Sequence, residues 1–199
     1  MNYAIIGFGS AGQALARMFA RKNIEVAVAG RRPPEALASQ AKAIGPTVIP
    51  ASLQDALKCE VLLLAIPFGG HRDLAKAAAS WQGKIVIDVT NAFGVPLEEL
   101  GGLPSSVVIS KALTGARLVK AFNHLPAQKL AEDPNIKGGR RVIFLSSDDE
   151  KAAEQVAALV EELGFAPVEL GKLAEGGLLV QARGSTWAQL IFQDFVKFT

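Results

Sequence analysis

The sequence predicts an α/β protein built on a doubly wound, mostly parallel sheet with a short C-terminal extension. Short apolar runs alternate with segments of helical spacing along the whole chain, the pattern of successive β–α units. Several runs, such as Tyr3 to Ile6 and Val61 to Ile66, are almost continuously apolar, as in parallel strands covered on both faces. The 199 residues, half apolar and one fifth charged, fit one globular domain over residues 1–199, with residues 141–199 as the extension.

The individual elements follow from local signals. Apolar spacing and proline, serine or aspartate at the starts predict helices over Ala11–Arg21, Pro33–Ile44, Ser52–Asp55, Arg72–Ala79 and Asp148 or Asp149 to Leu163. Gly164 supplies a left-handed stop for the last of these helices. The expected strands are Tyr3–Ile6, Glu25–Ala29, Thr47–Ile49, Val61–Ile66, Lys84–Val89, Leu118–Phe122, Arg141–Leu145 and Ala166–Leu170.

Two segments admit more than one interpretation. Ser105 to Leu113 begins with serines suited to a helix start, but Val107-Val108-Ile109 favours a strand. We favour a helix, because parallel strands need a crossover. The tail from Thr186 to Phe198 carries too many apolar residues for a solvated helix. It either docks on its own domain or meets a second subunit, as in a homodimer.

Composition excludes several classes of partner. The net charge of +2 indicates neither a basic surface for nucleic acid nor a polybasic membrane anchor. No stretch approaches the ~20 apolar residues of a membrane span, and Cys59 is the only cysteine, so we expect a cytoplasmic protein without an intramolecular disulfide. Cys59 is interpreted as structural. Two histidines and one cysteine far apart predict no metal site.

A glycine-rich sequence follows the first strand. Gly7-Phe8-Gly9-Ser10-Ala11-Gly12 matches the G-x-G-x-x-G pattern of Rossmann dinucleotide-binding domains, and it lies where a strand turns into a helix. Gly7 makes the turn, Gly9 leaves room for a pyrophosphate, and Gly12 lets the helix pack closely on the strand. The phosphates are expected at the helix N-terminus, on backbone N–H groups near Gly9, Ser10 and Ala11.

The end of the second strand indicates which dinucleotide binds. NAD-specific proteins place Asp or Glu there to bind the ribose 2′-hydroxyl, but this strand runs into Gly30-Arg31-Arg32. A carboxylate would repel a 2′-phosphate, whereas a guanidinium binds it through paired charge-assisted hydrogen bonds. The sequence therefore predicts NADP(H).

With later segments, these motifs resemble the NADPH-dependent F420 reductase family (F420-dependent NADP oxidoreductases), to which the cytosolic domain of the STEAP metalloreductases is similar. The segments that carry the resemblance are Gly7 to Gly12, Gly30-Arg31-Arg32, Ala65-Ile66-Pro67, Asp88-Val89-Thr90-Asn91 and Lys120-Ala121-Phe122-Asn123. The resemblance spans nearly the whole chain, and Lys-Ala-Phe-Asn is its most distinctive part. This sequence departs from the family pattern over Gly176 to Trp187, where it does not closely match the acceptor-binding end of the family.

The resemblance implies hydride transfer between NADP(H) and a flavin-type acceptor, which is F420, FMN or FAD. It also implies that Ala65, Ile66 and Pro67, together with Thr90 and Asn91, contact the ribose and nicotinamide. Asn123 and His124 would face the acceptor, on the side that the C-terminal extension completes. The alternatives are an NADPH-binding sensor without turnover and an imine reductase of the pyrroline-carboxylate reductase type, which needs a longer helical dimer domain.

The residues themselves agree with this arrangement. Pro67, Asn91, Asn123 and His124 follow expected strands, so they lie at the edge of the sheet where α/β proteins bind ligands. Hydride transfer between two rings in contact needs orientation more than an acid/base pair. His124 either donates a hydrogen bond to an acceptor carbonyl or is a loop histidine bonded to backbone. We expect His71 to be a solvated residue at a helix start.

Overall fold

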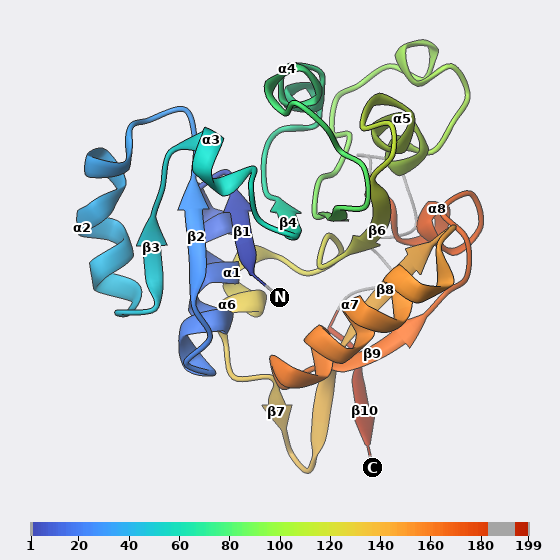
Figure 1. Ribbon diagram of the computed structural model, residues 1–199. Helices are drawn as coiled ribbons and strands as arrows, with labels where there is room; N and C mark the ends of the chain where they lie inside the picture. Colours follow the sequence, from blue (N-terminus) through green and yellow to red (C-terminus); the bar gives the residue numbers. More distant parts are fainter. Residues whose placement is uncertain (1, 183–193, 199) are drawn as a thin grey trace.

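The computed structural model describes residues 2–182 and 194–198. Within these ranges, ten strands form one sheet in the order β10-β8-β6-β5-β4-β1-β2-β3, with β7 and β9 paired to β8 (Figure 1). The strands are β1 Tyr3–Ile6, β2 Val26–Ala29, β3 Val48–Pro50, β4 Val61–Leu64, β5 Ile85–Asp88, β6 Arg117–Ala121, β7 Asn135–Ile136, β8 Gly139–Ser147, β9 Ala166–Glu169 and β10 Val196–Phe198. The helices are α1 Ser10–Arg21, α2 Pro34–Ile44, α3 Leu53–Ala56, α4 His71–Ala77, α5 Ser105–Ala112, α6 Ala127–Ala131, α7 Glu150–Glu162 and α8 Gly176–Val180, with 3₁₀ turns η1 Phe68–Gly70 and η2 Glu98–Leu100.

The strands from β1 to β6 confirm the predicted doubly wound topology. The pairings among these strands are all parallel, with β2 on one side of β1 and β4 on the other. The chain builds outward from β1 to β3, then crosses back to β4 and builds the other way. In Figure 1 the two directions are seen as α2 and β3 at one end and β8 and β9 at the other. Ligands bind at the carboxyl ends of the strands beside such a reversal point.

The sheet becomes mixed after β6. Strand β8 is antiparallel to β6, while β9 is parallel to β8, and β7 and β10 are antiparallel to it. The prediction of a mostly parallel sheet is therefore confirmed, with β8 and β9 running antiparallel to the strands from β1 to β6. β8 pairs directly with β6, so the segment expected as an extension begins inside the same sheet.

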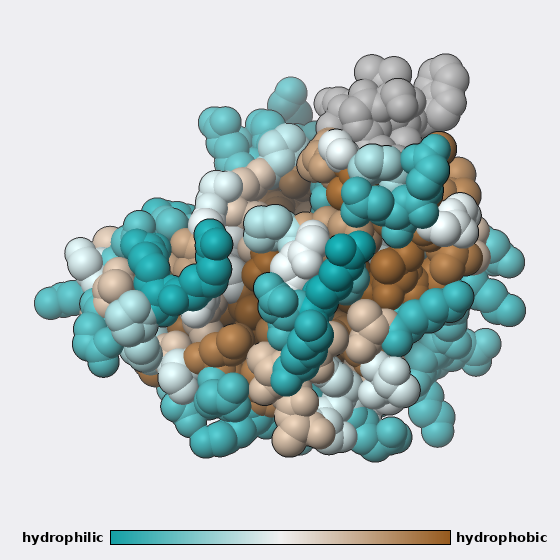
Figure 2. Space-filling view, turned by 90° about the horizontal axis from the view of Figure 1, so that it is seen from above, coloured by the Kyte–Doolittle hydropathy of each residue, from teal (hydrophilic) through white to brown (hydrophobic). Residues whose placement is uncertain are grey.

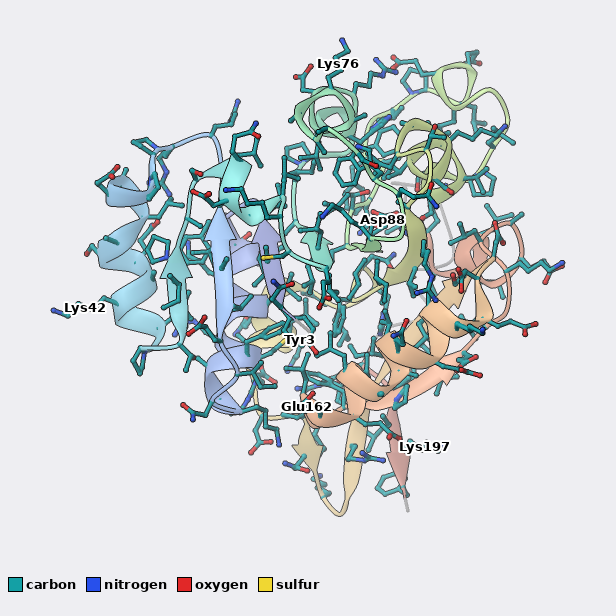
Figure 3. All side chains as sticks on the ribbon, viewed as in Figure 1. Tyr3, Lys42, Lys76, Asp88, Glu162 and Lys197 are labelled. Carbon is teal, nitrogen blue, oxygen red and sulfur yellow. The ribbon has the colours of Figure 1, made fainter. Side chains whose placement is uncertain are left out.

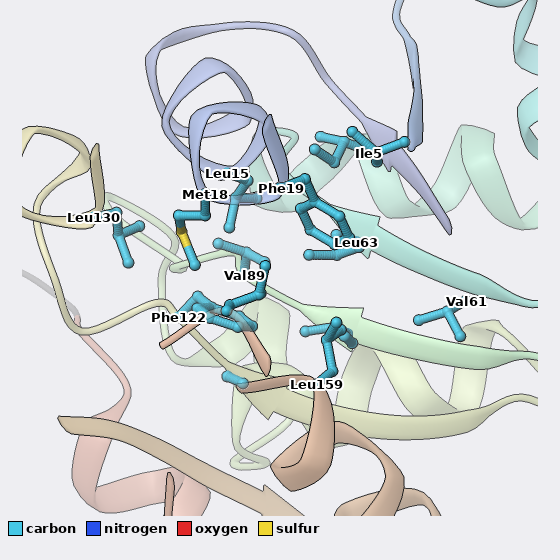
Figure 4. Close-up of a cluster of buried hydrophobic side chains, with 14 of the residues drawn as sticks. Ile5, Leu15, Met18, Phe19, Val61, Leu63, Val89, Phe122, Leu130 and Leu159 are labelled. Carbon is cyan, nitrogen blue, oxygen red and sulfur yellow. The ribbon is translucent and has the colours of Figure 1, made fainter. Parts of the chain in front are cut away.

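The two faces of the sheet are covered by different helices. One core contains Leu15, Met18 and Phe19 of α1, packed towards Ile5 and Leu63 on the strands (Figure 4). The same core includes residues of α2, α6 and α7. The second core joins the opposite faces of β1, β4 and β5 to α3, α4 and α5. Each fully buried Leu or Phe stabilises the fold by about 1.5–3 kcal/mol, so the two cores fix the sheet from both sides.

Most of the helix-end signals act as predicted. The Ser52 side chain accepts a hydrogen bond from the Asp55 N–H at 3.1 Å, and Asp149 accepts one from the Ala152 N–H at 2.9 Å. Gly164 has φ +94° after the last helical turn. The ambiguous segment from Ser105 is helical, as the crossover argument favours, and Pro104 rather than a serine occupies its N-cap.

The apolar tail is described only at its end, and Trp187, Leu190, Ile191 and Phe192 lie outside the described residues. Val196 to Phe198 form β10, which docks on β8 of the same chain. An ion pair between Asp194 and the buried Arg141 of β8 precedes this strand. Docking on its own domain is thus observed for this part, while a homodimer through the tail stays a prediction.

We predict that Gly12→Ala destabilises the protein by about 1–3 kcal/mol, because an overpacked site forces the backbone to shift. A Cβ on Gly12 would lie 1.9 Å from the Gly7 carbonyl oxygen, whereas a Cβ on Gly9 would meet nothing within 4 Å. Urea unfolding of Gly12→Ala and of Gly9→Ala measures the difference in their free energies of unfolding. Equal stability of Gly12→Ala and the wild type would show that α1 does not pack as described.

Candidate functional site

The predicted site residues lie at one edge of the sheet. Each group follows a parallel strand, directly or after one residue, and the strand order β2-β1-β4-β5-β6 arranges the groups in a row. Neighbouring strands lie about 4.8 Å apart, so the row is roughly 19 Å long. In strand order the groups are Gly30, Arg31 and Arg32; Gly7, Phe8, Gly9, Ser10, Ala11 and Gly12; Ala65, Ile66 and Pro67; Thr90 and Asn91; Asn123 and His124.

The glycine-rich turn holds α1 against the strands and leaves its N-terminus open. Gly7 has φ +102°, and a Cβ there would lie 2.3 Å from the Ala65 carbonyl oxygen. Phe8 is buried in the core, while Gly9 and Ser10 are exposed. Gly9 is the N-cap of α1 and contributes no side-chain hydrogen bond. The N–H groups of the first turn have no intrahelical partner, and no acidic side chain lies among them.

The two arginines after β2 differ in their contacts. Both side chains are exposed. Arg32 donates to the Gln40 side chain of α2 at 2.9 Å, which holds it beside that helix. Together they place two positive charges one loop away from the open N-terminus of α1.

Two asparagines link the ends of β5 and β6. Asn91 Nδ2 donates to the Asn123 carbonyl at 2.8 Å, and Asn123 Nδ2 donates to Asn91 Oδ1 at 3.1 Å. Asn123 Nδ2 also donates to the Val180 carbonyl, and the Ala182 N–H donates to Asn91 Oδ1. The asparagines therefore bind the segment after α8 to this edge.

The backbone at Phe122 makes this link possible. This buried residue has φ +62°, a conformation that costs a non-glycine residue about 1–2 kcal/mol. Phe122 packs into the core below α1 (Figure 4), while Asn123 turns to Asn91. Strained residues of this kind gather at ligand sites.

His124 is buried, with 8% of its surface exposed. Its Nε2 lies 3.3 Å from the Val142 carbonyl oxygen, and its ring packs against Phe144 with centroids 5.0 Å apart. Burial lowers the pKa of His124 to about 4, against the opposing effects of the hydrogen bond to Val142 and of Asp194. The neutral ring donates to Val142 through Nε2, so Nδ1 carries a lone pair. Donation to an acceptor needs the other tautomer, and this role of His124 stays a prediction.

A buried ion pair lies beneath the Thr90–Asn91 loop, and the sequence patterns did not predict it. Lys120 Nζ lies 3.2 Å from Asp88 Oδ2, and both side chains are fully buried. Asp88 also accepts hydrogen bonds from the Ser106 hydroxyl at 2.6 Å and the Thr90 N–H at 2.9 Å. Figure 3 shows Asp88 between α5 and β6. Both residues belong to segments that carry the family resemblance. The sequence does not show that they face each other across β5 and β6, and this register is what would have predicted the ion pair.

One prediction about a histidine was wrong. His71 begins α4 as expected, but it is 2% exposed rather than solvated. Its ring packs on Phe68 with centroids 4.8 Å apart, and its Nδ1 lies against the Phe68 carbonyl. The 3₁₀ turn between β4 and α4 folds the two rings together and removes His71 from water.

The residues at this edge fit a dinucleotide. Gly9 adds no side chain at the N-terminus of α1, and no protein atom lies within 4 Å of the position that its Cβ would take. Among the described residues, the buried Thr90 Oγ1 and Asn123 Oδ1 have no hydrogen-bond partner, and such atoms call for a ligand or water. The row therefore offers phosphate donors at one end and polar groups for an amide or hydroxyl at the other.

A separate hollow of about 440 Å³ does not suit this ligand. It lies between α7 and the segment after β9, and its lining includes Asp148, Glu150, Glu154, Glu169 and Glu175. Carboxylates repel phosphates, so this hollow does not suit a dinucleotide. Over residues 2–182 and 194–198, no group of three or more His, Cys, Asp or Glu side chains forms a candidate metal site.

Comparison with known proteins agrees with the geometry. Residues 2–92 match the family model described as NADP oxidoreductase, coenzyme F420-dependent. A solved structure of a hypothetical protein from Sinorhizobium meliloti is 40% identical, with a TM-score of 0.90 over 99% of this chain and 96% of that one. A putative F420-dependent NADP reductase from Arthrobacter is 27% identical, with a TM-score of 0.74 over 90% of each chain.

Residues 2–92 of the chain carry the domain of the F420-dependent NADP oxidoreductase family. The predicted family resemblance and the Rossmann-type fold are thereby confirmed, and the description of the family model, an NADP oxidoreductase, agrees with the predicted cofactor and reaction class. Metalloreductase STEAP3 of Rattus norvegicus is 25% identical over 173 residues, which is 85% of this chain. The chain spans about a third of the length of that curated relative (34%). The described part of the chain contains no helix long and apolar enough to span a bilayer.

We predict a pH-dependent contribution of His124 to stability. The folded-state pKa is about 4 and the ordinary value is 6.5, so between these values the unfolded chain binds a proton that the folded chain does not. The free energy of unfolding should fall by about 3 kcal/mol as the pH drops through this window. Below the window, His124 should cause no further loss of stability. His124→Leu removes the titration. Parallel curves of unfolding free energy against pH for variant and wild type would contradict the burial of His124.

Proposed function

We propose that this protein transfers hydride between NADP(H) and a flavin-type acceptor, F420, FMN or FAD, and that the row of loops at the carboxyl ends of β2 to β6 binds the two molecules. The observation that carries the proposal is the order of the loops. A phosphate-binding helix terminus lies between an arginine pair on one side and partnerless polar atoms at Thr90 and Asn123 on the other. This matches the order of groups along a dinucleotide phosphate.

Each group of residues has a physical task in this proposal. The N–H groups at Gly9, Ser10 and Ala11 hold the pyrophosphate, while Arg31 and Arg32 hold the 2′-phosphate. Ala65, Ile66 and Pro67 continue the row under the ribose, and Thr90 and Asn91 lie at the nicotinamide. When bound, NADPH supplies the hydride. The protein orients the two rings and excludes water between them.

Apolar surface near the nicotinamide end supports a flat aromatic acceptor. Phe93 is 53% exposed two residues after Asn91, and Leu178 and Leu179 of α8 are more than half exposed. Val180, directly after them, is bound to Asn123. The view from above shows apolar residues open to the surface among polar ones (Figure 2). We place the acceptor on this side, with Asn123 at the junction.

Replacing both Arg31 and Arg32 with alanine should weaken NADP(H) more than NAD(H), by about 1–3 kcal/mol for each charge-assisted hydrogen bond that is removed. Arg32 is tied to Gln40, so the single Arg31 and Arg32 variants separate the two contributions. Titration calorimetry with both cofactors measures them. An equal loss of affinity for NADP(H) and NAD(H) would refute the 2′-phosphate role.

Replacing Gly9 with alanine should abolish tight binding of both NADP(H) and NAD(H), because the methyl group enters the space of the pyrophosphate. Folding should be unaffected, since no protein atom lies within 4 Å of the added Cβ. Calorimetric titration beside an unfolding curve tests both statements. Wild-type cofactor affinity in a folded Gly9→Ala protein would remove the pyrophosphate from this turn.

Sequential titration tests the function itself. NADPH is added first, then F420, FMN or FAD is added to the loaded protein, and oxidation of NADPH is followed by absorbance. The proposal expects tight NADPH binding, a second ligand on top of it, and turnover. NADPH binding without a second ligand or turnover would favour a sensor instead.

A further inference from the structure

The burial of the ion pair Asp88–Lys120 is not explained by a contribution to the stability of the core. Both side chains are fully buried at the carboxyl ends of adjacent strands, where the two residues face each other in register. Taking two charges out of water is costly, and apolar side chains of similar volume at such positions are often as stable or more so. Stability of the core is therefore a weak reason for this pair.

The pair holds one residue of the site from both sides. Asp88 Oδ1 accepts the Thr90 N–H at 2.9 Å, and Lys120 Nζ donates to the Thr90 carbonyl at 3.1 Å. Both backbone groups of Thr90 are thus fixed by buried charges. The Thr90 hydroxyl is buried and has no hydrogen-bond partner among the described residues.

The surroundings make the arrangement rigid. Ser106, in the first turn of α5, donates its hydroxyl to Asp88 Oδ2. On the other side, a Cβ on Gly177 of α8 would lie 3.9 Å from Lys120 Cδ, so α8 covers the lysine stem. The asparagine link between Asn91 and Asn123 continues the network from Thr90 to the end of β6.

We propose that Asp88 and Lys120 are positioning residues that fix the Thr90–Asn91 loop for the nicotinamide end of the cofactor. This inference rests on the NADP(H) site proposed above, but not on the identity of the acceptor. Hydride transfer requires the reacting rings at close and defined separation, and a 1 Å misplacement costs roughly a hundredfold in rate. A loop held through both backbone groups of one residue supplies this precision.

The test is the double variant Asp88→Asn with Lys120→Met, which removes both charges at nearly constant volume. The introduced amide can still accept from the Thr90 N–H, whereas the introduced thioether cannot donate to the Thr90 carbonyl. Two ligands are titrated: NADPH, and adenosine 2′,5′-bisphosphate, which keeps the 2′-phosphate end and lacks nicotinamide. We expect the affinity for NADPH to fall by about tenfold, because the loop then holds its binding geometry only part of the time, while the affinity for adenosine 2′,5′-bisphosphate is unchanged.

A matched control lies at the other end of the same strand. Arg117 of β6 pairs with Asp149 through two hydrogen bonds of 2.8 and 3.0 Å. Arg117→Met with Asp149→Asn also deletes an ion pair, but away from the site, so both ligands should bind as in the wild type. If the Asp88/Lys120 variant does not fold, Ser106→Ala loosens Asp88 without removing a charge, and should weaken NADPH alone.

The outcomes separate the two proposals. A wild-type protein that fails to bind NADPH contradicts the proposed function and this inference with it. If the wild type binds NADPH and the folded double variant binds it equally well, the positioning role alone is overturned. The same holds for an unchanged affinity in Ser106→Ala, where that variant replaces the double variant. Equal weakening of both ligands also overturns it, because a general loss of structure does not distinguish the ends of the cofactor.

Discussion

The close approach of α1 to the ends of β1 and β4 is the contact on which the site depends. A Cβ on Gly7 would meet the Ala65 carbonyl oxygen, and one on Gly12 would meet the Gly7 carbonyl oxygen. Only backbone fits at these two positions. The contact brings the positive N-terminus of α1 to the edge where β4 and β5 also end. A cofactor held there by its phosphates can reach the loops after β5 and β6.

The buried hydrogen bonds described for the site lie at the carboxyl ends of the strands. Farther down the strands, both faces of the sheet are packed with aliphatic and aromatic side chains. At the carboxyl ends, backbone groups leave the ladder and need other partners. Asp88 and Lys120 provide these partners for Thr90, and Asn91 provides one for Asn123. The fold therefore changes from apolar packing to directed hydrogen bonds where a ligand must be oriented.

The features that the sequence predicts are those encoded within a few residues. The turn at Gly7, the Ser52 and Asp149 caps and the alternation of strands and helices depend on neighbours along the chain. The features that it did not predict depend on register. Asn91 and Asn123 are 32 positions apart, as are Asp88 and Lys120. A lysine in a strand suggests an exposed residue, and only the pairing of β5 with β6 shows that it is buried. β10 depends likewise on a partner strand far away in the chain.

We place NADP(H) along the carboxyl ends of β2 to β6, with its phosphates at the N-terminus of α1. This placement is best tested by following the backbone amide signals by NMR during titration with NADP⁺. We predict the largest shifts for the N–H groups of Gly9, Ser10 and Ala11, with further shifts at Arg31 and Asn91. Shifts centred on the acidic hollow at Glu154 and Glu169, with the first turn of α1 unchanged, would contradict it.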